Sequence, residues 1–312
     1  MNIVITGGNG FLGSKLAEKF YNNGHNIIII DKKRTSINKI INKKSKIKFI
    51  QANITSEKSL SKIKIKKNSI LLHCAGQPSA AMSFKRPLDD MEKNIEGMLN
   101  IINFSQKKKI NKIIFASTFN VYQENDRTPK LKENSACVPK SLYANSKLAA
   151  ENYLKVYATH LGVKWNILRM FNIYGPGQDP KNNFLGMISI FLNMAKKQPS
   201  IQVKGSLKRF RDFIYIDDVT EAWMKVASDK KNYNKVYNLG TGAKTTLGKL
   251  FYIISKVLKK KLTIKELKGT PGDFMGCYSD VSEIKKDLNF KAKTTLEKGV
   301  NQFNKWLDEK KN

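Results

Sequence analysis

Short apolar runs recur along the first half of the chain, and each ends at polar or turn-forming residues. They cover residues 3–6 (IVIT), 26–31 (NIIIID), 47–52 (IKFIQA), 69–76 (SILLHCAG), 112–118 (KIIFAST) and 163–171 (VKWNILRMF). Stretches with helical spacing separate several of these runs; Leu12, Leu16, Ala17 and Phe20, for example, fall on one helical face. Strands that alternate with helices predict an α/β fold whose parallel sheet is buried on both faces.

The regular alternation stops at residues 174–180 (YGPGQDP), where a Gly/Pro-rich loop precedes a less regular mixture. A chain of 312 residues can bury one large core or two unequal ones. We therefore expect a first domain over residues 1–172 and a second, smaller one over 173–312.

The formal net charge of +32 is the unusual feature of the composition. A basic surface attracts nucleic acid or other polyanions when its lysines cluster and alternate with aromatic residues. Here the lysine runs, such as 107–109 and 259–261, are short, dispersed and without interleaved aromatics. This dispersed pattern indicates lysines spread over solvent-exposed surfaces, and we expect no nucleic-acid partner.

Cysteine and histidine usage indicates neither a disulfide framework nor a metal site. Cys74, Cys137 and Cys277 are far apart and odd in number, which suits a reducing compartment. The three histidines show no metal-ligand spacing, so no metal is expected. No apolar run is long enough to cross a bilayer and the chain opens on a strand, so we expect a cytoplasmic protein without membrane insertion.

A glycine-rich turn links the first predicted strand to the first predicted helix. Gly7, Gly10 and Gly13 of ITGGNGFLGS allow a tight turn, close approach to a pyrophosphate and close helix–strand packing. Asp31 ends the next strand, where a carboxylate binds the adenosine ribose hydroxyls and repels a 2′-phosphate. This context predicts NAD rather than NADP. A P-loop is excluded because no Gly-Lys-Ser/Thr closes the turn.

Tyr143 and Lys147 lie four residues apart in a helical stretch and so share one face. A nearby ammonium group favours a phenolate, so we expect a lowered pKa for Tyr143 and a role as general base on an alcohol. Ser117 and Thr118 add two hydroxyls at the end of the strand that precedes this helix.

Together with these features, a series of motifs in order resembles one known family nearly from end to end. The motifs are TGGNGFLGS (6–14), HCAGQPSAAMSFKRPLDDMEKNIEGMLNI (73–101), STFNVY (117–122), SLYANSKLAAE (141–151), RMFNIYGPGQ (169–178), GSLKRFRDFIYIDDV (205–219), YNLGTG (237–242) and PGDF (271–274). The chain resembles extended short-chain dehydrogenase/reductases of the NAD-dependent sugar epimerase/dehydratase group, most closely the UDP-glucose 4-epimerases.

The resemblance implies an α/β architecture with a Rossmann-type doubly wound parallel sheet and a smaller C-terminal α/β substrate-binding domain. Residues 1–172 would bind NAD, with residues from about 213 to 242 returning to that domain. Residues 173–312 would mainly bind a nucleotide sugar. It also implies a homodimer formed through helices at about 87–109 and 141–160.

By the same resemblance, Tyr143 is the catalytic base, Lys147 holds the nicotinamide ribose, Thr118 contacts the sugar hydroxyl and Ser117 supports it. The residues implied in cofactor binding are Gly7, Gly10, Phe11, Leu12, Gly13, Asp31, Asn53, Ile54, Ala75, Asn94, Tyr143 and Lys147. Those implied in substrate binding are Ser83, Thr118, Asn172, Arg211 and Cys277. Arg211 suits a diphosphate because its planar guanidinium pairs with phosphate oxygens.

Two departures from the family pattern bear on the substrate. Thr270 stands where the family often carries a second diphosphate-binding arginine. Cys277 stands at the position where a tyrosine narrows the sugar pocket of 4-epimerases and a smaller residue admits 2-acetamido sugars. We therefore expect UDP-N-acetylhexosamines to be accepted; the alternative is that Cys277 is a small packing residue.

Phe119 and Asn120 decide between the reactions of the resembled family. Its 4,6-dehydratases carry Asp-Glu after the threonine, and its UDP-glucuronate decarboxylases carry a Glu at the second of these positions. Neither Phe119 nor Asn120 can transfer a proton. This excludes elimination and favours an NAD-dependent UDP-hexose 4-epimerase that acts through a transient 4-keto sugar.

Three alternatives stay open in the sequence. A nucleotide-linked keto-sugar reductase would share every motif, and residues 75–79 (AGQPS) also resemble C2-epimerases of CDP-linked sugars. A non-enzymatic NAD-binding sensor is disfavoured because it needs no Tyr143, Lys147 and Thr118 together. The sequence does not decide which nucleotide and sugar bind.

Overall fold

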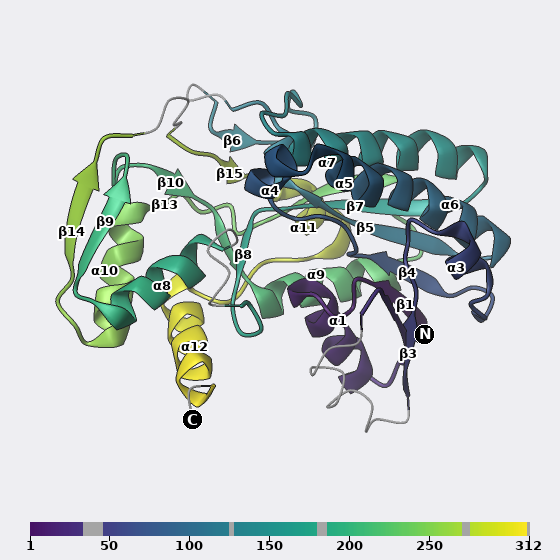
Figure 1. Cartoon of the computed structure of the whole chain (residues 1–312), viewed down its shortest axis with the longest axis horizontal. Coiled ribbons are helices and arrows are strands. Elements are labelled where there is room, and N and C mark those ends of the chain that lie inside the picture. Colours follow the sequence, from purple (N-terminus) through teal and green to yellow (C-terminus); the bar gives the residue numbers. More distant parts are fainter. Residues whose placement is uncertain (34–45, 125–127, 180–185, 270–274, 311–312) are drawn as a thin grey trace. The chain divides into compact units, whose positions relative to one another are not determined.

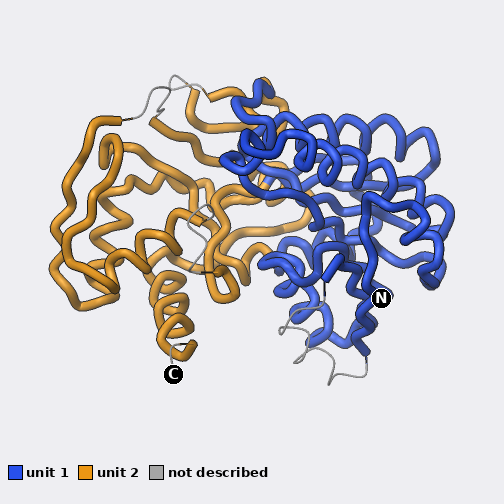
Figure 2. Tube along the Cα trace, in the orientation of Figure 1, with its two compact units in different colours: residues 1–121, 137–169, 220–237 blue, residues 122–136, 170–219, 238–312 orange. Residues whose placement is uncertain are grey.

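A computed structural model describes residues 1–33, 46–124, 128–179, 186–269 and 275–310. The described chain forms two compact units (Figure 2). Unit 1 contains residues 1–121, 137–169 and 220–237, and unit 2 contains residues 122–136, 170–219 and 238–312. The expected boundary at residue 172 stays a prediction; the units alternate along the chain, and residues 122–136 fall in unit 2.

A seven-stranded parallel sheet forms the centre of unit 1 (Figure 1). Its strands in chain order are β1 (Asn2–Thr6), β2 (Asn26–Asp31), β3 (Ile47–Gln51), β4 (Ile70–His73), β5 (Lys112–Thr118), β7 (Lys164–Met170) and β12 (Lys235–Leu239). The six strands predicted from the apolar runs are confirmed, with ends that differ by up to three residues. The spatial order β12-β7-β5-β4-β1-β2-β3 reverses between β1 and β4 and confirms the doubly wound architecture.

Helices cover both faces of this sheet (Figure 1). They are α1 (Phe11–Asn22), α3 (Glu57–Ser61), α4 (Ala80–Lys85), α5 (Pro87–Met91), α6 (Gly97–Lys107), α7 (Leu142–Tyr153) and α9 (Ile216–Ser228), with π-helical turns η1 (Glu92–Glu96) and η3 (Leu154–Ala158) and a 3₁₀ turn η2 (Phe119–Val121). The core under α6 and α7 joins side chains such as Ile101, Phe115 and Leu154, all nearly inaccessible. Burying each such side chain stabilises the fold by about 1.5–3 kcal/mol.

Polar contacts fix two helices on the opposite face. Lys19 of α1 pairs with Glu221 of α9 at 2.7 Å. The buried Nζ of Lys112, at the start of β5, donates to the carbonyl oxygens of Val226 at 2.6 Å and Asp229 at 2.9 Å, where α9 ends. An ammonium group satisfies the unpaired carbonyls of a helix C-terminus and stabilises its dipole.

The described residues of unit 2 form short strand pairs and several helices. Its strands are β6 (Lys130–Leu131), β8 (Asn172–Tyr174), β9 (Ser200–Lys204), β10 (Phe210–Arg211), β11 (Phe213–Tyr215), β13 (Thr245–Thr246), β14 (Thr263–Leu267) and β15 (Tyr278–Ser279); its helices are α8 (Met187–Lys197), α10 (Leu247–Leu258), α11 (Ser282–Leu288) and α12 (Leu296–Glu309). They pair as β10-β13, β11-β8, β14-β9 and β15-β6. Each pair joins segments distant in sequence, which explains the irregular pattern after residue 174.

Among the described residues, no helix is long and apolar enough to cross a membrane.

Candidate active site

The glycine-rich turn lies between β1 and α1, beside the loop that follows β4. Gly7 has φ +70°, and a Cβ on it would lie 2.6 Å from the backbone nitrogen of Ala75. Gly13 is equally restricted, because its Cβ would lie 2.2 Å from the carbonyl oxygen of Gly7. The two loops therefore meet at the reversal of strand order, where doubly wound folds bind dinucleotides.

The N-terminus of α1 offers a site for phosphate. Gly10 occupies its N-cap position and no side chain caps the first N–H groups. The buried Oδ1 of Asn9 has no hydrogen-bond partner among the described residues. Phe11 and Leu12 begin the helix and are half-buried. These features fit a dinucleotide pyrophosphate.

Asp31 is held at the end of β2 by the same turn. Its Oδ2 accepts a hydrogen bond from the backbone N–H of Asn9 at 3.0 Å. The carboxylate is half-buried and keeps acceptor positions for a ribose.

The other predicted cofactor residues differ in their surroundings. Asn53 is exposed, and its side chain donates to Thr55 Oγ1 at 2.7 Å and accepts from the Thr55 N–H at 3.3 Å. Ile54 is buried and packs near Gly97 of α6. Asn94 is also buried and is bonded to other side chains, as described below. Their roles in NAD binding stay predictions.

Thr118 lies at the end of β5, at the proposed catalytic centre. Every residue of this central strand is buried, and Thr118 is its last residue. Thr118 Oγ1 accepts from the backbone N–H of Asn120 at 3.2 Å. Its hydroxyl lies close enough to the Tyr143 side chain to lower the pKa of that phenol. The shared role of Thr118 and Tyr143 on a sugar hydroxyl stays a prediction.

α7 carries Tyr143 and Lys147 one turn apart. Ser141 caps this helix by accepting from the N–H of Ala144 at 3.1 Å, so the helix begins just before Tyr143. Lys147 is buried, and its Nζ lies 4.1 Å from the centroid of the Phe115 ring. That distance allows a cation–π contact, which favours the charged amine.

The expected low pKa of Tyr143 is wrong for this protein structure. Burial raises the pKa of Tyr143 to about 12; the nearby Thr118 hydroxyl lowers it and the charge of Asp90 raises it further. Burial also lowers the pKa of Lys147 to about 8, and the neighbouring Cys74, Glu151 and Asp90 oppose that shift. Desolvation of the phenolate therefore outweighs the attraction of the ammonium group that the sequence suggested.

Ser117 points into a buried ion-pair cluster. Its hydroxyl donates to Glu151 Oε1 at 2.5 Å. Arg169 donates to the same carboxylate, from Nε to Oε1 at 3.0 Å and from Nη2 to Oε2 at 2.6 Å, and Lys155 approaches Oε2 at 3.4 Å. Sequence reasoning missed Glu151 and Arg169, which are 0% and 3% exposed. A catalytic role for Ser117 stays a prediction.

Three of the predicted substrate residues come together in unit 2. Asn172 Nδ2 donates to the carbonyl oxygen of Asp212 at 2.9 Å. Arg211 Nη1 donates to the carbonyl oxygens of Phe210 at 2.7 Å and Met275 at 3.4 Å. Cys277 is buried near Arg211, and burial raises the pKa of its thiol to about 12. The other two lie in unit 1: Thr118, and Ser83, whose hydroxyl donates to Ala80 O at 2.7 Å. Thr270 and residues 271–274 lie outside the described residues.

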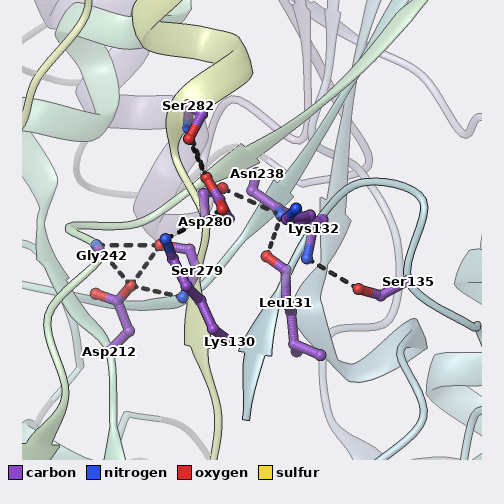
Figure 3. A network of polar contacts seen from close by, with 10 residues as sticks. All are labelled: Lys130, Leu131, Lys132, Ser135, Asp212, Asn238, Gly242, Ser279, Asp280 and Ser282. Atoms are coloured by element: carbon purple, nitrogen blue, oxygen red, sulfur yellow. Dashed lines mark hydrogen bonds and ion pairs between the residues drawn. The ribbon is translucent and has the colours of Figure 1, made fainter. Parts of the chain in front are cut away.

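A buried carboxylate, Asp212, holds this part of unit 2 together (Figure 3). Its oxygens accept from Thr241 N–H at 2.9 Å and hydroxyl at 2.5 Å, Gly242 N–H at 3.0 Å, and Ser279 N–H at 3.1 Å and hydroxyl at 2.5 Å. This satisfies a buried charge without a cation. Asp212 fixes the segments that carry Arg211 and Cys277, and the sequence analysis did not single it out.

Among the described residues no three metal-ligating side chains lie close enough to hold a metal ion.

The doubly wound sheet, the glycine turn and the Thr118–Tyr143–Lys147 set define a dinucleotide-dependent enzyme acting on an alcohol. A family model described as "NAD dependent epimerase/dehydratase family" matches residues 3–240. The chain belongs to this family, and its cofactor is NAD.

Known relatives match along almost the whole chain. A putative UDP-glucose 4-epimerase of Methanocaldococcus jannaschii is 33% identical over 306 residues, covering 98% of each chain. The solved structure of a UDP-glucose 4-epimerase from Thermotoga maritima, with UDP-glucose, superposes with a TM-score of 0.90 at 30% identity and covers 100% of both chains. A UDP-N-acetylglucosamine 4-epimerase from Methanobrevibacter ruminantium, in complex with UDP-N-acetylmuramic acid, gives 0.88 at 29% identity, covering 99% and 98%.

Proposed function

We propose that the protein is an NAD-dependent UDP-hexose 4-epimerase that works through a transient 4-keto sugar. The observation that carries the proposal is the nearness of Thr118, the last residue of β5, to the Tyr143 side chain, with two residues that lack an acidic proton, Phe119 and Asn120, directly after Thr118. The names of the two 4-epimerase structures support the same reaction.

The side chains divide the work as follows. Tyr143 takes the proton of the sugar 4-hydroxyl and later returns it, while Thr118 orients that hydroxyl. The Lys147 ammonium binds the nicotinamide ribose and adds positive charge near the phenolate. NAD⁺ held at the glycine turn and Asp31 would supply the hydride acceptor and a further positive charge that favours the phenolate. Because the residues after Thr118 carry no acid that could drive loss of water, the site supports reversible oxidation of the sugar and not elimination.

Asn172, Arg211 and Ser83 would bind the nucleotide sugar. Arg211 suits the diphosphate because a guanidinium pairs with two phosphate oxygens at once. The buried, compact Cys277 supports room for a 2-acetamido group. We therefore include UDP-N-acetylhexosamines among the substrates.

The test is product analysis without added cofactor. Purified protein is incubated with UDP-glucose, UDP-N-acetylglucosamine and CDP-linked sugars, and the products are followed by NMR. We expect C4 epimers of UDP sugars from the NAD that copurifies. Turnover only with stoichiometric NAD(P)H would replace the proposal with a keto-sugar reductase, and epimers only of CDP sugars at C2 would replace it with a C2-epimerase.

We also propose a homodimer formed through α4, α5 and α7 with η3. Phe84 of α4 and Leu88 of α5 are 62% and 74% exposed, and Tyr153 of α7 and Val156 of η3 are 45% and 74% exposed. Large apolar side chains gathered on neighbouring helices are typical of an interface. In analytical ultracentrifugation, Val156→Asp should give a monomer, and Tyr252→Asp, at an exposed residue of α10, should not. A cytoplasmic location stays a prediction.

A further inference from the structure

A buried carboxylate lies beside the proposed catalytic pair and has no part in the reaction described so far. Asp90, on α5, is 1% exposed. Its Oδ1 accepts from Gln77 Nε2 at 2.9 Å and from Asn94 Nδ2 at 3.2 Å. Asp90 forms no ion pair within the described ranges of the chain. Burial raises the pKa of Asp90, while the hydrogen bonds from neutral donors and the charge of Lys147 lower it, so these groups support the charged carboxylate.

The chain is folded so that this network reaches the catalytic helix. The π-helical turn η1 carries Asn94, whose Nδ2 also donates to Ser146 Oγ at 3.0 Å. Gly76 permits this approach, because a Cβ there would lie 2.4 Å from Asn94 Oδ1. Ser146 lies between Tyr143 and Lys147 on α7, and its hydroxyl donates to the Tyr143 carbonyl oxygen at 3.0 Å. Single-turn π-helices of this kind are frequent at functional sites.

Several other charged or titratable groups lie near Lys147. The thiol of Cys74 has its pKa raised to about 12 by burial, so it is neutral at ordinary pH. His73 is also neutral, because burial and Lys147 lower its pKa to about 3.

The remaining carboxylates are already paired with cations. Glu151 is bonded to Arg169 and Lys155, and Asp89 pairs with Lys93. Of the described carboxylates around the catalytic pair, Asp90 is thus the one whose charge no arginine or lysine neutralises by contact.

We propose that Asp90 is a positioning residue of the catalytic pair: its buried carboxylate keeps the Lys147 ammonium charged and sets the pH range in which Tyr143 can act as a base. Burial alone makes the amine easier to deprotonate, and Asp90 opposes this effect. The same negative charge holds the proton on Tyr143 more tightly. Asp90 therefore raises the pKa of both Tyr143 and Lys147, so the pH interval between the two pKa values keeps its width.

The proposal rests on the proposed function for its kinetic test. Asp90→Asn removes the charge and keeps the shape, and its amide oxygen can still accept from Gln77 and Asn94. Both limbs of the kcat–pH profile should move to lower pH by about one unit, because Tyr143 and Lys147 both lose their protons more easily. Asp90→Glu should restore the wild-type limbs. Asp89→Asn, next in the chain, should leave them in place.

A direct measurement separates this inference from the proposed function. The pKa of Lys147 in the NAD-bound protein is read by NMR with carbon-labelled lysine, assigned with Lys147→Met. Asp90→Asn should lower that pKa by about one unit. Asp90→Ser serves the same measurement if the Asn variant does not fold. A shift without any epimerase turnover in the wild type would overturn the function alone. An unchanged pKa, or a kcat profile lowered in height but not displaced, would overturn the role of Asp90.

Discussion

The two units each bury a carboxylate near functional side chains, and they use it differently. In unit 1, Glu151 is paired with Arg169 and Lys155, and Asp90 lies near Lys147. In unit 2, Asp212 accepts only from neutral backbone N–H groups and hydroxyls among its described partners.

The buried carboxylates differ because the two units place different kinds of groups around them. Under the proposed function the groups of unit 1 exchange protons, so the charges around them would decide the pH at which they react. Asp212 instead joins three segments that are distant in sequence, around residues 212, 241 and 279. Its donors carry no charge, and it fixes the shape around Arg211 and Cys277; its own charge adds to the effect of burial in raising the pKa of the Cys277 thiol. Substitutions in unit 1 should therefore change rate and pH dependence, and those in unit 2 should change substrate preference.

The largest effect is expected from removal of the base in unit 1. Tyr143→Phe leaves the ring in place and removes the group that accepts the proton. kcat should fall about 10³-fold, while bound NAD and the melting temperature stay close to wild type. Tyr252→Phe, at an exposed tyrosine of α10 outside the proposed interface, is the matched control for turnover. A Tyr143→Phe enzyme that retains turnover would exclude Tyr143 as the base.

The Glu151 cluster should contribute to stability. Glu151→Gln leaves the buried Arg169 opposite a neutral amide, so the free energy of unfolding should fall by about 3 kcal/mol. Urea unfolding measures this change. Glu96→Gln, at an exposed glutamate, should cost less than about 0.5 kcal/mol. Equal stabilities of the two variants would mean that the ion pair contributes nothing net.

A substitution in unit 2 should alter selectivity instead. Cys277→Tyr adds a ring at a buried position and should exclude the acetamido group. The ratio of kcat/KM for UDP-glucose over UDP-N-acetylglucosamine should rise about 100-fold, with turnover of UDP-glucose retained. The ratio is measured with both substrates on one enzyme preparation. Unchanged selectivity would reduce Cys277 to a packing residue.

The sequence predicted best what depends on neighbouring residues. The glycine turn, the six strands and the spacing of Tyr143 and Lys147 are local patterns, and the structure contains them. What it missed depends on residues far apart in the chain: Glu151 and Arg169 are 18 residues apart, and Asp212 and Ser279 are 67 apart.

The predicted direction of the Tyr143 pKa shift was wrong for a related reason. A helical spacing shows which charge is near, but it does not show how completely water is excluded. Asp90 and Asn94, four residues apart, did carry a signal in the sequence, since a polar pair at helical spacing can act together.

The smallest predicted effect concerns His73 and the pH dependence of the free energy of unfolding. It also allows the acid stability of the two units to be compared. Its Nδ1 is hydrogen bonded to Thr6 Oγ1 at 2.7 Å, and burial, aided by Lys147, lowers its pKa from 6.5 to about 3. Between these values the unfolded chain binds a proton that the folded chain does not. The free energy of unfolding therefore falls as the pH drops below 6.5, by about 1.4 kcal/mol per pH unit from this group.

The measurement compares urea unfolding of wild type and His73→Asn at pH 6.5 and about one unit lower. Asn can keep the bond to Thr6 without titrating, so its pH dependence should be the shallower of the two; His160→Asn, at an exposed histidine, is the control. Equal slopes in wild type and His73→Asn would contradict the assignment. Because His73 lies in unit 1, hydrogen-exchange protection factors at the lower pH should fall first in the parallel sheet and later in the segments that Asp212 joins. Simultaneous loss of protection would show that acid acts on both units as one cooperative structure.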